Sequence, residues 1–133
     1  MFIVFIFSMW HSNGMDIIEV SIDILKPTLY NPRKWDEFQL QALEKSIKEF
    51  SLVEPIVVNK DMTIVGGHYR VQAAKKLGYK KIPCVVVELS KTKEKALNLA
   101  LNRISGDWDF TKLADILQEI NTGEFDMDIV GFS

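Results

Sequence analysis

Apolar and polar residues follow two regular patterns in the first third of the chain beyond Met15. Between residues 18 and 22 every second residue is isoleucine or valine, which predicts a half-buried strand. Over residues 37–50 apolar residues recur at helical spacing, and Asp36 and Gln39 have the three-residue separation of a capping box. This part of the chain therefore predicts a strand, a proline-containing loop and a helix that begins after Asp36.

The central part of the chain predicts three more strands and one helix. Segments 55–59 and 63–65 are short and rich in β-branched residues, which indicates two strands around a tight turn. A helix is expected over 68–77, and Gly78 follows it in the position that glycine commonly takes just beyond a helix end. The mostly β-branched run 82–88 is typical of a buried strand.

Two further helices are predicted towards the C-terminus. An apolar stripe over 96–104 predicts a third helix that ends at Gly106. Asp109 has the place of an N-cap for a fourth helix, whose apolar face comprises Leu113, Ile116, Leu117 and Ile120. Strands and helices in this mixed order predict an α+β fold, a single domain with a small mixed sheet and about four helices.

The first fourteen residues differ from the rest of the chain. The apolar run Phe2–Phe7 has six residues, whereas a membrane span needs about 20, and no basic segment or small-residue cleavage site of a secretory signal accompanies it. We expect residues 1–14 to be an extension outside a domain that covers 15–133, with no membrane partner. The alternative is a short strand or adhesive segment that packs on the domain or on a neighbour.

Composition narrows the classes of protein and site. The 133 residues include one cysteine, Cys84, and two histidines. A single cysteine excludes a disulfide within the chain and a multi-cysteine zinc site, and the scarcity of histidine argues against a metal centre. Cys84 lies in a predicted buried strand, where a thiol acts as a small hydrophobic side chain. These features predict a cytoplasmic protein without its own metal site.

Charge is unevenly distributed although the net charge is only −2. Residues 60–103 contain ten Lys and Arg against three Asp and Glu, a local charge of +7, whereas residues 104–133 carry −6. A basic block of this kind attracts polyanions, which predicts weak and non-specific DNA binding. Its densest cluster is Lys75, Lys76, Lys80 and Lys81. The alternative is that these lysines only solvate helix faces.

The segment Thr63–Gly78, TIVGGHYRVQAAKKLG, has the pattern of an anion-binding turn. Gly66 and Gly67 separate a predicted strand from a predicted helix and allow the backbone to approach a bound group closely. The N-terminus of a helix favours phosphate, and Arg70 lies one turn inside, where it has the reach for bidentate contacts. In the alternative, structural reading, Arg70 pairs with an acidic side chain of the protein itself.

Three separated motifs resemble the ParB/sulfiredoxin superfamily, specifically its ParB N-terminal-like or "ParB-like nuclease" domain. They are Asn31-Pro32-Arg33, the helix core before Glu54-Pro55-Ile56-Val57-Val58, and the motif GGHYRVQAAKKLG. The stretch EKALNLALNRISGDWD is similar to a phage and mobile-element branch that often accompanies DNA methyltransferases. The resemblance covers about residues 16–133 and implies the ParB/sulfiredoxin-like fold.

The resemblance also implies a nucleotide or phosphate site, with a nucleoside triphosphate or diphosphate and Mg²⁺ as cofactors. The residues that match it are Asn31, Arg33, Gly66, Gly67, His68, Tyr69 and Arg70. His68 stands where sulfiredoxins have their catalytic cysteine, so that reaction is not expected. Against the CTP motif of partition proteins, Gly67 and Arg70 match, whereas His68 and Tyr69 replace Glu and Arg.

Two classes of function are open. The first is a DNA-associated module in DNA partition, modification or mobile-element biology, with DNA and a methyltransferase or another phage protein as partners. The second is an enzyme of the same fold, a nuclease or a nucleotide-dependent phosphotransferase, with His68 and Glu54 as candidate catalytic groups. Against a nuclease, the sequence has no compact carboxylate cluster for two metal ions. The binding module is the preferred interpretation.

Overall fold

The computed structural model describes residues 16–28, 36–103 and 109–131 and contains a four-stranded mixed sheet. The strands are β1 (Ile17–Ser21), β2 (Ile56–Asn59), β3 (Ile64–Gly66) and β4 (Lys81–Val87), in the order β1-β4-β2-β3. Strand β4 pairs antiparallel with β1 and parallel with β2, which in turn pairs antiparallel with β3. The central position of β4 and β2 agrees with their apolar sequences, and β3 forms one edge.

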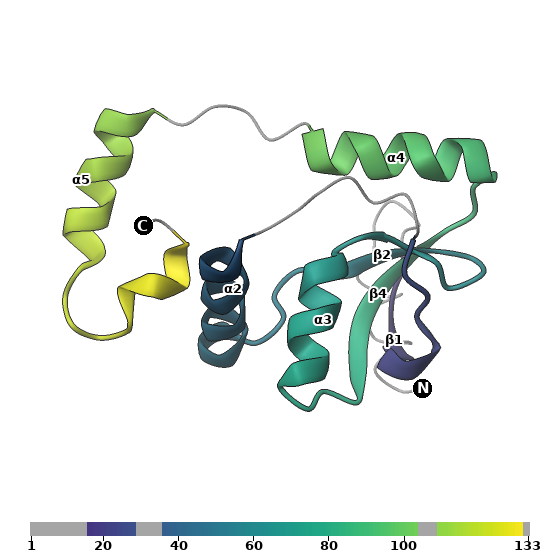
Figure 1. The fold of residues 1–133 in the computed structure, drawn as a ribbon, viewed down its shortest axis with the longest axis horizontal. Helices are drawn as coiled ribbons and strands as arrows, with labels where there is room; N and C mark the ends of the chain where they lie inside the picture. The colour runs from purple at the N-terminus through teal and green to yellow at the C-terminus, as the bar shows by residue number, and fades with distance from the viewer. Residues whose placement is uncertain (1–15, 29–35, 104–108, 132–133) are drawn as a thin grey trace.

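The described part of the chain has four α-helices, of which α3 and α4 contact the sheet (Figure 1). Helices α2 and α3 stand side by side, α4 lies across the edge formed by β3, and α5 lies at the far side with the C-terminal segment. The predicted α+β class, the mixed sheet and the four helices are confirmed. The helices are α2 (Glu37–Phe50), α3 (His68–Lys76), α4 (Lys91–Arg103) and α5 (Phe110–Ile120), with 3₁₀ turns η1 (Ile22–Ile24) and η2 (Met127–Val130).

The local signals for helix ends act as the sequence predicts. The Asp36 carboxylate accepts from the backbone N–H of Gln39 at 2.8 Å, and the Gln39 side chain accepts from the Asp36 N–H at 3.0 Å, which completes the capping box. Gly78 follows α3 with φ of 88°, in the left-handed region that favours glycine. Asp109 caps α5 through the N–H of Lys112.

The core lies between the sheet, α3 and the 3₁₀ turn after β1. Ile56, Val58 and Ile82 have no exposed area, and Val71 and Ala74 of α3 pack against them. Cys84 is also fully buried, and burial raises the pKa of its thiol to about 11. This confirms its expected part as a small hydrophobic side chain.

Helix α4 differs from the apolar stripe predicted over 96–104. Its buried side chains are Glu94 and Asn98, 1% and 0% exposed, whereas Leu101 is 44% exposed. The carboxylate of Glu94 accepts from the Asn59 side chain at 2.7 Å and from Lys91 at 3.1 Å. Polar residues replace apolar ones here because they satisfy polar groups at the end of β2 and along β3, which an apolar face would leave without partners.

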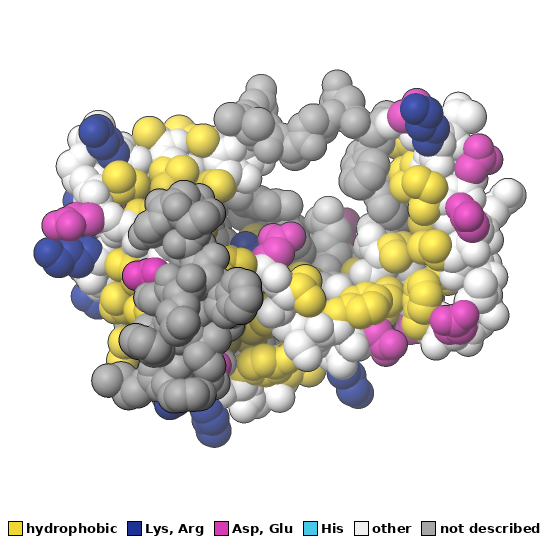
Figure 2. All heavy atoms as spheres, turned by 180° about the vertical axis from the view of Figure 1, so that it is seen from behind, with side chains coloured by type: hydrophobic (Ala, Val, Ile, Leu, Met, Phe, Trp, Pro, Cys, Tyr) yellow, Lys and Arg dark blue, Asp and Glu magenta, His cyan; other side chains and the backbone are white. Residues whose placement is uncertain are grey.

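The apolar face predicted for α5 is not buried. No residue of this helix is buried, and Ile116 is 51% exposed. Viewed from behind, hydrophobic side chains gather along α5 and the neighbouring C-terminal segment (Figure 2). That segment reaches α2, where Lys45 pairs with Asp126 at 3.0 Å and with Asp128 at 3.1 Å.

Two further expectations concern the N-terminal extension and the absence of a membrane span. The predicted N-terminal extension, 1–14, lies outside the described residues. Across 16–28, 36–103 and 109–131, no helix combines the length and the apolar character that crossing a bilayer requires.

Candidate functional site

Two successive glycines connect β3 to α3: Gly66 ends the strand and Gly67 precedes the helix. Gly67 has φ of 99°, and a Cβ atom added there would lie 2.8 Å from Cδ1 of Ile56. A Cβ at Gly66 would lie 2.8 Å from Cδ1 of Leu101, on α4. The turn therefore brings the backbone close to a core strand and to the end of α4. A larger residue would be strained at Gly67 by the positive φ, whereas at Gly66 it would require the Leu101 side chain to move.

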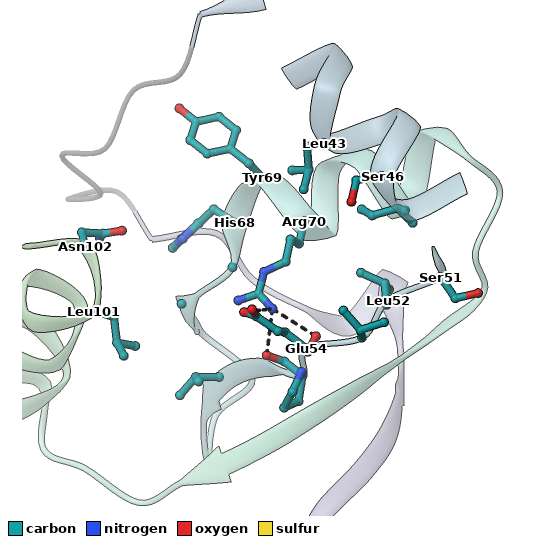
Figure 3. Close-up of a pocket in the computed structure, with 16 residues that line it drawn as sticks. Leu43, Ser46, Ser51, Leu52, Glu54, His68, Tyr69, Arg70, Leu101 and Asn102 are labelled. Carbon is teal, nitrogen blue, oxygen red and sulfur yellow. Dashed lines mark hydrogen bonds and ion pairs between the residues drawn. The ribbon is translucent and has the colours of Figure 1, made fainter. Parts of the chain in front are cut away.

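A cavity of about 550 Å³ opens at this turn. Its walls are the second half of α2, the connection 51–55, the glycine turn with the first turn of α3, and the end of α4 (Figure 3). Leu43, Leu52 and Leu101 give it apolar surface, and Ser46 and Asn102 contribute polar groups. The volume is in the range of small-molecule sites, about 300–1,000 Å³, which usually combine apolar walls with a few polar groups.

Arg70 is the cationic group of this cavity and is held by the chain on the opposite wall. Its Nη1 donates to the carbonyl oxygens of Glu54 at 3.0 Å and of Pro55 at 3.2 Å. The same Nη1 lies 3.4 Å from Oε2 of the Glu54 carboxylate. Arg70 thus pairs with an acidic residue of the protein, as the structural alternative predicted, while it also faces the cavity (Figure 3).

His68 begins α3 and links it to the segment that follows β1. Its Nε2 accepts from the backbone N–H of Thr28 at 3.2 Å and lies 2.6 Å from the Thr28 hydroxyl oxygen. Because Nε2 accepts, the neutral ring carries its proton on Nδ1. Burial lowers the pKa of His68 and favours this neutral form.

The structure brings together six of the predicted site residues and leaves others apart. Glu54 and the five-residue run from Gly66 to Arg70 line the one cavity, whereas Asn31 and Arg33 lie outside the described residues. The predicted nucleic-acid cluster is exposed and does not line the cavity; it comprises Lys75, Lys76, Lys80 and Lys81. Within it, Lys76 pairs with Glu44 of α2 at 3.1 Å.

Several cavity residues were missed by the sequence analysis. Leu43 was assigned to a helix core, and Ser46, Leu52 and Asn102 were not assigned to the site, yet all four line it. The sequence did contain one signal for them. The predicted helix ends only a few residues before Glu54, which was itself a predicted site residue, so the last turns of α2 were expected to lie near the site. Asn102 also donates to the carbonyl oxygen of Asn98 at 2.9 Å and closes the end of its own helix.

Few charged or metal-binding side chains line this cavity among the described residues. In the part of the chain that the structure describes, no three His, Cys, Asp or Glu side chains gather in a way that would hold a metal ion. Among the described residues that line the cavity, Glu54 and Arg70 are those with a formal charge.

Comparison with known proteins identifies the family of this chain. The family model of the ParB N-terminal domain matches residues 9–103. The chain belongs to the ParB N-terminal domain family. A probable chromosome-partitioning protein ParB from Campylobacter jejuni is 36% identical over 87 residues, which are 62% of this chain and 31% of that protein. The chain thus spans about a third of the length of this relative.

Solved structures with a similar fold support the same family. C-terminally truncated ParB from Caulobacter crescentus complexed with CTP-gamma-S has a TM-score of 0.70 and 28% identity, covering 77% of this chain and 61% of that one. The same protein complexed to the centromeric parS site has a TM-score of 0.55 and 27% identity, with coverages of 76% and 55%. Sulfiredoxin from Arabidopsis thaliana has a TM-score of 0.52 and 25% identity, with coverages of 61% and 94%. This ParB N-terminal domain therefore has the ParB/sulfiredoxin fold that the sequence predicted.

Proposed function

We propose that this ParB N-terminal domain is part of a DNA-associated protein and binds a nucleoside triphosphate or diphosphate, with Mg²⁺, in the cavity at the glycine turn. The observation that carries the proposal is the cavity itself, whose lining includes the left-handed Gly67 and the first turn of α3 with the Arg70 side chain. A helix N-terminus next to a close backbone approach suits phosphate, because the dipole and the donors both favour an anion.

The remaining walls suit a nucleoside. Leucines of α2 and of the 51–55 connection offer apolar surface for a base or sugar, and Ser46 and Asn102 supply hydrogen-bonding groups. CTP is the first nucleotide to test, because the Caulobacter ParB was solved with CTP-gamma-S. Because His68 and Tyr69 replace the Glu and Arg of the CTP motif, the other nucleoside triphosphates have to be tested beside CTP.

DNA is the proposed macromolecular partner. The relatives above are a chromosome-partitioning protein and a ParB complexed to parS, rather than a methyltransferase or a phage protein. The exposed lysines Lys75, Lys80 and Lys81 supply positive charge outside the cavity. We expect weak binding that falls steeply between low and physiological salt, because counterions are released from the DNA backbone. Fluorescence anisotropy with duplexes of two unrelated sequences tests this expectation. An affinity that does not change with salt concentration would contradict it.

Calorimetric titration with each nucleoside triphosphate and Mg²⁺ tests the cavity, with two leucine variants of one helix. Leu101→Trp replaces a leucine on the cavity wall by a larger, aromatic side chain, whereas Leu99→Trp makes the same change at an exposed position of α4 that does not line the cavity. We expect Leu101→Trp to weaken nucleotide binding at least about tenfold, with Leu99→Trp close to wild type. No binding by wild type, or equal loss in both variants, would contradict the proposal. Chromatography of the same samples measures hydrolysis and so separates the binding module from the enzyme.

A further inference from the structure

The cavity carries almost no net positive charge as the protein stands. Among its described lining residues, Arg70 contributes one positive charge and the Glu54 carboxylate one negative charge, 3.4 Å from Nη1. His68 adds none near neutral pH, because burial lowers its pKa. An entering polyphosphate therefore meets a guanidinium that already has an anion beside it.

The Glu54 carboxylate is not what holds Arg70 in place. The guanidinium donates to two backbone carbonyls, of Glu54 at 3.0 Å and Pro55 at 3.2 Å, both shorter than its distance to the carboxylate. The Glu54 side chain is 76% exposed, compared with 23% for Arg70. A carboxylate at that exposure can rotate into water with little loss of stability, since exposed ion pairs contribute little.

We propose that Glu54 is an intramolecular competitor for the anion-binding side of Arg70, which the phosphates of the ligand displace. This inference rests on the proposed function. With the carboxylate rotated away, Arg70 keeps its backbone bonds and the cavity has a net charge of +1. The phosphate chain then takes the place of the carboxylate, so Glu54 sets how much negative charge a ligand needs to enter.

The opposite role makes the opposite prediction. If Glu54 served to position Arg70 for the ligand, removing its charge would weaken binding. Glu54→Gln separates the two roles, because it keeps the size and polarity of the side chain and leaves the backbone carbonyl in place. The matched control is Glu88→Gln: Glu88 is 79% exposed and pairs with Lys60 at 3.2 Å, away from the cavity, so the net charge changes equally.

The experiment is calorimetric titration of the whole chain with CTP and Mg²⁺ at two salt concentrations. We expect Glu54→Gln to bind about 2- to 5-fold tighter than wild type, the size of one exposed ion pair, and Glu88→Gln to bind like wild type. The gain should shrink at high salt, where the repulsion is screened. Binding by wild type with an equal or weaker affinity in Glu54→Gln would overturn the competitor role and leave the nucleotide site intact. An equal gain in Glu88→Gln would also overturn it, and no binding by any of the three proteins would overturn the site as well.

Discussion

The side-chain amide of Asn98 donates to the backbone carbonyl oxygen of Val65 at 2.8 Å, and both residues are fully buried. Val65 lies in β3, the edge strand next to the glycine turn, and Asn98 lies in α4. The hydrogen bond satisfies a carbonyl that points away from the sheet's hydrogen-bonding partners, and it fixes the helix that covers this edge. The position of Leu101, one turn further along α4, therefore depends on a polar contact.

Replacing Asn98 by leucine should destabilise the protein although it adds an apolar side chain to a buried position. The Val65 carbonyl would lose its partner, which costs about 1–3 kcal/mol of the free energy of unfolding. Urea denaturation measures the loss, and the exposed Asn121→Leu serves as a control that should change stability by less than about 0.5 kcal/mol. Equal stability of Asn98→Leu and wild type would show that this contact does not secure α4.

The two left-handed glycines at the ends of α3 should respond differently to alanine. At Gly78 a Cβ atom meets nothing within 4 Å, so alanine adds only the cost of a positive φ, about 1–2 kcal/mol. At Gly67 the same strain is joined by a 2.8 Å approach to Ile56, and overpacking adds about 1–3 kcal/mol more. Denaturation of both variants measures the difference. Similar losses in the two would mean that the turn relaxes to accept a side chain.

Stability should depend on pH through His68. Burial places its folded pKa below 6.5, so the unfolded chain takes up a proton at a higher pH than the folded one. The free energy of unfolding is unaffected well above pH 6.5 and falls as the pH drops through the folded pKa, by at most about 1.4 kcal/mol per pH unit for one proton. His68→Gln should flatten this dependence between pH 7 and pH 5. Parallel profiles for the two proteins would show that His68 does not contribute.

Local signals in the sequence predict most of the elements. Capping at Asp36 and Asp109 and the glycine after α3 act within a few residues, so the helix bounds follow from neighbouring side chains alone. The buried face of α4 could not be predicted in this way, because Glu94 and Asn98 are buried by partners in β2 and β3, more than thirty residues away. Periodicity weighs apolar residues, so it indicated a stripe that includes Leu101 but missed the two buried polar side chains.

For the candidate site too, the local motif could be predicted from the sequence, whereas its long-range partners could not. The glycine pair, His68 and Arg70 stand out in the sequence because strand, turn and helix follow one another directly. The pairing of Arg70 with Glu54 was open, since both phosphate and an internal acid fit an arginine in that place, and only the path of the chain after α2 decides between them. The partner of His68, Thr28, lies forty residues earlier and carries no local signal.

The central claim is that a nucleotide binds at the glycine turn, and backbone amide chemical shifts measured during a titration with CTP and Mg²⁺ test it most directly. We expect saturable shift changes at Gly66, Gly67 and Tyr69, with Gly78 and Lys80 unchanged, because the latter two do not line the cavity. Each of the five reports on its own position, so the result does not depend on any substitution. Changes confined to the lysine surface, or no changes at saturating nucleotide, would contradict the account.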